Sequence, residues 1–295
     1  MKRPSPDLKK NIRNEDSLAC VQAALIGQGL ATPEARYVPM PGGRTNRLWR
    51  YDYKGNTLVC KLFANRGTPL FPNSADHEAA ALTRLQNTGL APQLVAKVDS
   101  DAGPILIYRH VLGPNFGTDT APVATSLKQL HALQPPEGLR KLKTNTILAQ
   151  GAAILETQTR DGHRLAQLRP PEPDLPPAPP VFLHGDVVAD NIIETPHGIC
   201  LIDWQCPAVG DRTEDLAIFL SPAMQHVNGR IPLSKTQEAT FLAAYGHPDA
   251  TERYRVLVPA YHWRMAAYCL WKAQAGDLDY LEGFQLEIAR LETLR

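Results

Sequence analysis

Residues 181–193 of this chain read VFLHGDVVADNII, and residues 199–204 read ICLIDW. The first stretch begins with the apolar run of one buried strand and ends with the start of a second, and the other stretch contains the apolar run of a third. Polar side chains lie where these strands begin or end. Asp186 lies in the loop after the first strand, Asn191 opens the next strand, and Asp203 follows the last. The pattern predicts a strand and a hairpin that share one polar end.

The turn between the last two strands sets which residues face each other. If Thr195 faces Gly198 across a two-residue turn, Asn191 lies beside Ile202 and within one residue of Asp203. Two hard oxygen ligands then converge at the open end of the hairpin.

That arrangement suits Mg²⁺, which takes one or two protein oxygens and completes its octahedron with phosphate and water. A further carboxylate on the loop, Asp186, could orient a hydroxyl nucleophile. Taken singly, Asp186 and Asp203 are also typical turn residues and Asn191 a typical loop amide. Their combination at this spacing, at the ends of buried strands, favours a functional site.

The segments HGD-x₄-N at 184–191 and IDW at 202–204 resemble the catalytic and metal-binding segments of the aminoglycoside phosphotransferase and choline kinase group, which has the protein-kinase-like fold. The resemblance implies that Asp186 is the catalytic base, supported by His184, and that Asn191 and Asp203 are Mg²⁺ ligands.

Residues 210–217, GDRTEDLA, also resemble this family. The resemblance implies that Asp211 braces the catalytic loop. Asp215 is interpreted as a carboxylate that favours the start of a helix.

A candidate nucleotide loop lies upstream, where residues 41–46 read PGGRTN between two predicted strands. Gly42 and Gly43 would let backbone amides approach phosphate oxygens, with Thr45 and Asn46 completing the loop. Alone, this motif is typical of an ordinary hairpin turn. It is not a GxGxxG loop, although relatives of choline kinase tolerate a Gly-Gly-x-x-Asn form.

A charged pair is expected behind this loop. Lys61 interrupts the apolar run at 58–63, and Glu78 shares a stripe of the helix predicted at 75–86 with Leu82. A carboxylate on a packed face is costly unless it is paired, and Lys61 is the natural partner. The family carries such a pair, in which the lysine binds the α- and β-phosphates of the nucleotide.

The sequence departs from its relatives at Gln205, two residues after Asp203, where many of them have an acid. This leaves open whether a second metal ion binds.

Residues 261–271, YHWRMAAYCLW, are rich in aromatic side chains. Such a surface on a helix is typical of core, but part of it could enclose a cationic substrate through cation–π contacts. A choline-type substrate would want an acid nearby, such as Glu252, Asp277 or Asp279, whereas aminoglycosides would prefer an open, acid-lined cleft. The candidate substrate residues are Tyr261, Trp263, Tyr268 and Trp271.

Composition bounds the class of protein. Thirty-one Lys and Arg against 30 Asp and Glu give a net charge of +1, which offers no general attraction for nucleic acid or an anionic membrane. Five scattered cysteines without a CxxC pair argue against a disulfide framework and structural zinc. The N-terminus lacks the apolar core of a signal peptide, and no apolar stretch reaches membrane-spanning length. We expect a cytoplasmic protein with no obligate protein partner.

Periodicity and turn signals predict a bilobal α+β chain. A small antiparallel-sheet lobe with one packed helix spans 1–108, a hinge spans 109–120, and a larger, mainly helical lobe spans 121–295. The expected helices lie at 17–30, 75–86, 144–168, 212–224, 235–245 and 250–275, one more begins near residue 123, and the proline-rich stretch at 170–180 is read as an extended connector.

Together these features predict a protein-kinase-like enzyme that binds ATP and Mg²⁺. It would transfer the γ-phosphoryl group to a hydroxyl of a small, cationic or amino-containing molecule, such as a choline-, ethanolamine-, thiamine- or aminoglycoside-like substrate. One alternative is a nucleotide-binding pseudokinase, motivated by Gln205 and the short glycine loop. Another is a metallohydrolase using His184, Asp186 and Asp203, which would leave Lys61 unexplained.

Overall fold

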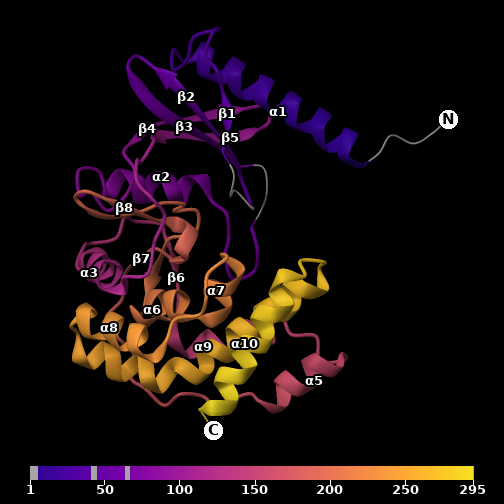
Figure 1. Ribbon diagram of the computed structural model, residues 1–295, viewed down its shortest axis with the longest axis vertical. Helices are drawn as coiled ribbons and strands as arrows, with labels where there is room; N and C mark the ends of the chain where they lie inside the picture. The colour runs from indigo at the N-terminus through magenta and orange to yellow at the C-terminus, as the bar shows by residue number, and fades with distance from the viewer. Residues whose placement is uncertain (1–5, 41–44, 64–66, 295) are drawn as a thin grey trace, which may run out of the picture.

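A computed structural model describes residues 6–40, 45–63 and 67–294 of the chain. Figure 1 shows a small sheet-containing lobe above a larger helical lobe. The elements of the small lobe, called the N-lobe here, are α1 (Pro6–Gly27), β1 (Val38–Pro39), β2 (Arg47–Tyr53), β3 (Asn56–Leu62), α2 (Ala75–Arg84), β4 (Leu94–Ser100) and β5 (Gly103–Arg109).

The N-lobe sheet has the strand order β1-β2-β3-β5-β4, and every neighbouring pair is antiparallel. Side chains alternate between the two faces of a strand, so β3 divides its residues between two cores. Cys60 packs with Val21 and Leu25 of α1 on the outer face, whereas Val59 packs toward α2 on the inner face. Lys61 shares the inner face with Val59 and therefore points toward α2 and the cleft.

The helix α2 is positioned by its cap. Ser74 Oγ accepts a hydrogen bond from the backbone N–H of His77 at 3.2 Å, satisfying one of the unpaired donors at the helix start. Glu78, Ala81 and Leu82 are buried on one stripe of this helix, as predicted. The stripe aims the Glu78 carboxylate at the inner face of the sheet.

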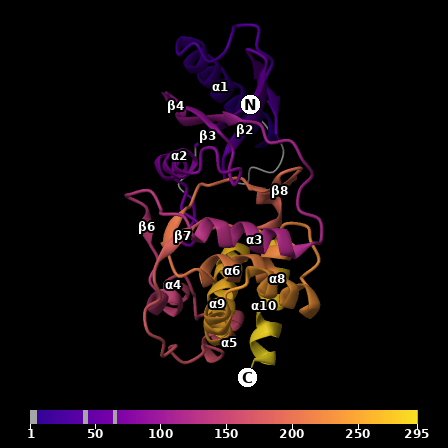
Figure 2. The same ribbon diagram turned by 90° about the vertical axis from the view of Figure 1, so that its left-hand side faces the viewer.

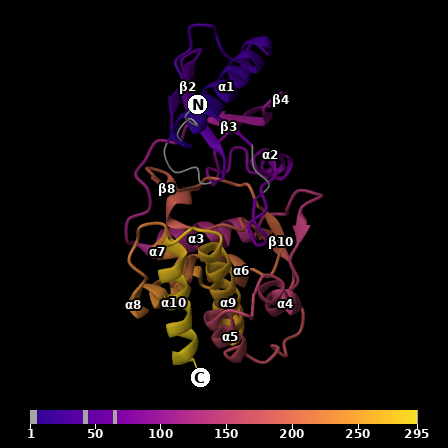
Figure 3. The same ribbon diagram turned by 90° about the vertical axis from the view of Figure 1, so that its right-hand side faces the viewer.

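The larger lobe, the C-lobe, combines helices with two small sheets. A long helix, α9, packs beside α10, and α3 lies between the N-lobe and the remaining helices (Figures 2 and 3). Its elements are α3 (Thr120–His131), β6 (Arg140–Lys141), a 3₁₀ turn (Thr144–Thr146), α4 (Ile147–Ala152), α5 (Arg160–Gln167), β7 (Val181–Leu183), β8 (Ile192–Thr195), β9 (Gly198–Leu201), β10 (Ala208–Gly210), α6 (Thr213–Leu220), α7 (Pro222–Val227), α8 (Lys235–Tyr245), α9 (Pro248–Gln274) and α10 (Asp279–Thr293).

The predicted α+β architecture is confirmed, and several elements differ in extent. The single helix expected at 144–168 is divided, because Thr159 Oγ1 accepts from the Gly162 backbone N–H at 3.1 Å and caps a new helix. The strand β4 and the helix α10 were not predicted, and α1 begins well before residue 17. Within the described ranges, no helix has both the length and the hydropathy needed to cross a bilayer.

Candidate active site

The catalytic-loop segment leaves β7 through a sharp turn at Gly185. Its φ of +82° lies in the left-handed region, and a Cβ here would lie 2.3 Å from the carbonyl oxygen of Cys206. Only glycine fits both constraints, so the HGD triplet turns abruptly and brings Asp186 into the cleft.

His184 supports this loop with its ring. Its Nε2–H donates to the carbonyl oxygen of Ile202 at 3.0 Å, and its Nδ1 accepts from the backbone N–H of Asp186 at 3.2 Å. Burial lowers the pKa of His184, which favours this neutral form. The ring thus ties the Asp186 loop to the residue that precedes Asp203, and both nitrogens are already engaged within the protein.

The acid that braces the loop is Asp215, so the expectation that Asp211 would brace it was wrong. Asp215 does lie in the first turn of α6, as expected, but its carboxylate also reaches the loop. Asp215 accepts from the backbone N–H groups of His184 and Gly185 at 2.9 and 2.8 Å and contacts His131 at 3.1 Å. Although burial raises the pKa of Asp215, these hydrogen bonds outweigh it and hold that pKa below its usual range.

Asp211 faces a different part of the C-lobe. Its carboxylate accepts from Arg253 at 2.5 Å and from the side chain and backbone of Thr213 at 2.8 and 3.1 Å. Asp211 precedes α6 and Asp215 lies in its first turn, so the two acids are close in sequence but only Asp215 is carried by the helix. Sequence spacing alone could not tell which of them reaches the loop.

Asn191 and Asp186 are in contact. The Asn191 Nδ2 donates to the backbone oxygen of Asp186 at 3.0 Å and to its Oδ2 at 3.3 Å. Ile202 N–H donates to the Asn191 carbonyl at 2.9 Å, and Thr195 pairs with Gly198, so the predicted hairpin register is confirmed. Asn191 is buried and turned inward, beside the catalytic loop.

Lys61 joins the two lobes. Its Nζ lies 2.5 Å from Glu78 Oε2 and 2.5 Å from Asp203 Oδ1, and the lysine side chain is only 1% exposed. Burial lowers the pKa of Lys61, but the charges of Asp203 and Glu78 outweigh it and raise that pKa above its usual value. The predicted Lys61–Glu78 pair is therefore present, and Lys61 also reaches Asp203.

In the described part of the chain, three carboxylates of the cleft, Glu78, Asp186 and Asp203, lie near a single ammonium group, that of Lys61. Burial raises the pKa of Asp186 to about 7, and the neighbouring charge of Asp203 adds to this effect. Burial also raises the pKa of Glu78 to about 7, against the lowering effect of Lys61. Raised pKa values of this kind are typical of a functional site with uncompensated negative charge, which a bound cation would stabilise.

The donor set fits Mg²⁺. Within the described residues, no group donates a hydrogen bond to Oδ1 of Asn191 or to Oδ2 of Asp203, so one oxygen of each side chain is available. Asp203 adopts a left-handed backbone with φ of +60°, a strained conformation typical of functional sites. Within the same ranges no cluster of three or more His, Cys, Asp or Glu side chains could hold a metal ion.

A pocket of about 490 Å³ lies between the lobes on one side of Asp203. Its wall includes Val59, Lys61, Tyr108 and Ile202 from the two lobes and the segment from His110 to Gly113 that follows β5. Sequence reasoning missed these wall residues; their only signal was their position directly after the last strand of the N-lobe. Gly42 and Gly43 lie outside the described residues.

Asn46 connects the predicted nucleotide loop to Gln205. Its Nδ2 donates to Gln205 Oε1 at 3.1 Å and to Asn73 Oδ1 at 2.9 Å, and Gln205 also accepts from the Ser74 backbone N–H at 3.0 Å through its carbonyl. Gln205 therefore ties the segment after Asp203 to the residue before β2 and to the start of α2. Thr45 lines a second pocket nearby.

This second pocket, about 260 Å³, lies on the other side of Asp203. Asp186 and Tyr268 both line it, and the charge of Asp186 contributes to a raised pKa of the Tyr268 hydroxyl, chiefly caused by burial. Asp190 and Asp203 line both pockets. The two cavities therefore meet at the aspartates.

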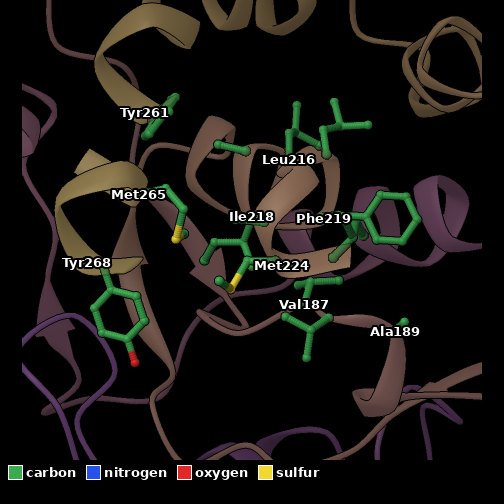
Figure 4. Packing of buried hydrophobic residues seen from close by; sticks show 14 of the residues in the cluster. Val187, Ala189, Leu216, Ile218, Phe219, Met224, Tyr261, Met265 and Tyr268 are labelled. Atoms are coloured by element: carbon green, nitrogen blue, oxygen red, sulfur yellow. The ribbon is translucent and has the colours of Figure 1, made fainter. Parts of the chain in front are cut away.

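The candidate substrate residues separate into two groups. Tyr261 and Trp263 are core, since Tyr261 hydrogen-bonds to Thr213 at 2.7 Å and Trp263 Nε1 donates to the Leu165 carbonyl at 2.8 Å. Figure 4 shows Tyr261 and Tyr268 on the same side of α9, with Tyr268 farther along the helix. Only Tyr268 lines the second pocket, and Trp271 stacks against its ring with centroids 5.9 Å apart.

Comparison with known proteins places these features in context. A model of the phosphotransferase enzyme family matches residues 36–257. A search of curated proteins finds no match.

Solved structures resemble the chain over nearly its whole length at low identity. A choline/ethanolamine kinase family protein from Mesorhizobium loti has a TM-score of 0.66 at 16% identity, covering 96% of this chain and 94% of that one. The choline kinase LicA from Streptococcus pneumoniae has a TM-score of 0.64 at 18% identity, covering 97% and 99%. The aminoglycoside phosphotransferase APH(4)-Ia has a TM-score of 0.68 at 13% identity, covering 93% and 98%.

Proposed function

The chain belongs to the phosphotransferase enzyme family, and we propose that it transfers the γ-phosphoryl group of ATP to a hydroxyl group of a small molecule. The observation that carries the proposal is the convergence at Asp203. Lys61 from the N-lobe contacts it at 2.5 Å, and the pockets on its two sides include Asp186 in one and the inter-lobe wall in the other.

The 490 Å³ pocket would hold the nucleotide. Its apolar faces, from residues such as Val59 and Ile202, suit a planar base, and Lys61 stands where the α- and β-phosphates would lie. Among the structural neighbours, LicA forms a complex with AMP, and an APH(4)-Ia variant forms one with ADP and hygromycin B. The wall at 110–113 supports the reading of residues 109–120 as a hinge.

Mg²⁺ would be held by Asn191 and Asp203, and when bound it neutralises charge on the phosphate oxygens. Before metal and nucleotide bind, Lys61 neutralises part of the charge of Asp203. Glu78 holds that lysine from behind, so its ammonium group is fixed without a large loss of side-chain entropy on binding.

Asp186 would act as the base. The acceptor oxygen forms a bond to the γ-phosphorus, the bridging bond between the β- and γ-phosphates breaks with its electron pair leaving on ADP, and the hydroxyl proton passes to the Asp186 carboxylate. Asn191 Nδ2 fixes one Asp186 oxygen, so the other is free to face the acceptor. Because the transition state is loose, most of the acceleration would come from position and electrostatics.

The pseudokinase alternative was motivated by Gln205 and the short glycine loop, and the hydrogen bond from Asn46 gives Gln205 a structural role that does not require a loss of activity. The metallohydrolase alternative loses support because both ring nitrogens of His184 contact the backbone. The acceptor itself is considered below, starting from the lining of the second pocket.

The test is a screen of the purified protein with Mg-ATP against a library of small alcohols, with ADP release as the readout. We expect at least one acceptor to raise ADP release far above the rate with ATP alone, and Asp186→Ala to abolish the increase. A folded, ATP-binding protein that phosphorylates no acceptor in the library would contradict the proposed function.

A further inference from the structure

The lining of the second pocket includes a positively charged side chain. Lys272 follows Tyr268 by four residues on α9, so the two side chains lie one turn apart on the same face of the helix. Both line the pocket, together with Tyr280 of α10. Asp186, Tyr268 and Lys272 therefore line the same pocket.

Lys272 is held in place by two contacts. Its Nζ lies 2.8 Å from Asp277 Oδ2 and 5.1 Å from the centroid of the Tyr280 ring. The lysine side chain is 22% exposed and lines the pocket. Asp277, which the sequence suggested as a partner for a cationic substrate, is instead engaged with a cation of the protein.

The aromatic rings at this wall are already engaged by the protein. Tyr268 stacks on Trp271 and meets Phe71 and Tyr280 edge to face, with centroids 5.0 and 5.8 Å away. Lys272 covers the Tyr280 ring. A quaternary ammonium group would need open ring faces and would meet a like charge in their place.

We propose that the acceptor carries an anionic group, a carboxylate or a phosphate, which binds Lys272 while the acceptor hydroxyl faces Asp186. This inference rests on the proposed function and departs from the expectation of a cationic acceptor. It follows from the charges that line the pocket, because the carboxylates Asp186, Asp190 and Asp203 lie where the proposed transfer would take place, and Lys272, one turn farther along α9 than Tyr268, supplies a positive charge. A volume of about 260 Å³ limits the acceptor to a small molecule.

The first experiment compares alcohols of different charge under identical Mg-ATP conditions. The anionic probes are glycerate and glycerol 3-phosphate, the neutral probe is glycerol, and the cationic probes are choline and ethanolamine. We expect the highest kcat/KM with one of the anionic probes, and the better of the two identifies the group as carboxylate or phosphate. A preference for choline or ethanolamine would overturn the inference and leave the proposed function standing.

The second experiment removes the charge. Lys272→Met keeps the side-chain length, and we expect it to raise KM for the preferred anionic probe about 10- to 100-fold, the effect of losing a hydrogen bond to a charged group. The KM for ATP should stay unchanged, because Lys272 does not line the other pocket. The matched control is Lys97→Met, which removes another lysine paired with an aspartate, Asp76, far from both pockets.

A binding measurement separates the two proposals. Calorimetric titration of each anionic probe into the Mg-ADP complex requires no turnover. Binding that weakens at least 10-fold in Lys272→Met supports the inference even if no probe is phosphorylated, a result that would count against the proposed function alone. Equal affinity of the wild type and Lys272→Met for both anionic probes would overturn the inference.

Discussion

Two groups of buried charges lie close together in this protein and differ in how they are balanced. At the cleft, the single ammonium group of Lys61 contacts both Glu78 and Asp203. Around the start of α6 in the C-lobe, two buried acids each have a guanidinium group of their own: Asp211 pairs with Arg253 at 2.5 Å, and Glu214 pairs with Arg264 at 2.6 Å.

The pKa values follow this balance. At the cleft, burial raises the pKa of Asp186 to about 7, whereas at the start of α6 the pKa of Asp211 lies below its usual value because hydrogen bonds from Arg253 and Thr213 outweigh its burial. The acids that are paired with arginines stabilise the fold. The excess negative charge of the cleft carboxylates is what a magnesium–triphosphate complex would neutralise.

The largest effect is expected from removing the proposed base, Asp186. Asp186→Ala should lower kcat about 10²- to 10⁴-fold, the range typical of a general base, while Mg-ATP still binds. The measurement is ADP release with a phosphorylated acceptor, beside calorimetric titration of Mg-ATP. Asp99→Ala, an exposed aspartate of the N-lobe, serves as the control. Near-normal turnover in Asp186→Ala would show that another group accepts the proton.

Removing the shared cation tests the other half of the cleft. Lys61→Met leaves Glu78 buried without its partner, so we expect about 3 kcal/mol lower stability and at least 10-fold weaker binding of Mg-ATP. Glu78→Gln should be milder, because an amide oxygen still accepts from the lysine. Urea denaturation and calorimetry measure the two effects. If ATP affinity is the same in Lys61→Met and wild type, Lys61 does not bind phosphate.

A stability comparison sharpens the contrast between the two groups. Asp211→Asn breaks a balanced pair and should cost about 3 kcal/mol at neutral pH, whereas Asp186→Asn relieves repulsion from Asp203 and should leave the metal-free protein as stable or slightly more so. Denaturation in EDTA tests both. A larger loss in Asp186→Asn than in Asp211→Asn would contradict the charge balance described here.

The stability lost in Asp211→Asn should depend on pH, because the pKa of Asp211 is shifted in the folded state. Because the pKa of Asp211 is lower in the folded state than in the unfolded state, its stabilisation is present above the unfolded pKa of about 4 and is lost as the pH falls through the folded value. The difference between wild type and Asp211→Asn should therefore shrink below about pH 4. A difference that grows on acidification would contradict the assignment.

The smallest effect is expected at the contact between the lobes. Gln205→Ala removes the acceptor for Asn46 Nδ2 and should raise KM for ATP several-fold with little change in kcat, since about 1 kcal/mol accompanies a lost neutral hydrogen bond. Steady-state kinetics at saturating acceptor measure this split. Gln205→Glu still accepts from Asn46 and should restore the ATP affinity, whereas a loss of kcat in Gln205→Ala would give Gln205 a role in the transfer itself.

Much of the site could be predicted because its signals are local. The hairpin register follows from the turn between Thr195 and Gly198, and Glu78 was assigned to Lys61 because a carboxylate on a packed helix face needs a partner. That Asp215 and not Asp211 braces the catalytic loop could not be foreseen, because it depends on how α6 is rotated against the loop.

The second pocket was the part of the site that the sequence predicted least well. The position of Tyr268 at its wall, and of Trp263 in the core, is set by the packing of α9 against α5 and α10. The engagement of Lys272 by Asp277 crosses the turn after α9 and leaves no periodic pattern in the sequence. The helix α10, which supplies Tyr280, was not predicted at all.

The most direct test of the account is a crystal structure of the protein with Mg²⁺ and a non-hydrolysable ATP analogue. We expect a Mg²⁺ ion on Asn191 and Asp203, the triphosphate against Lys61, and the γ-phosphate facing Asp186 from the pocket lined by residues 110–113. A nucleotide bound elsewhere, or a metal ion that contacts neither Asn191 nor Asp203, would contradict it.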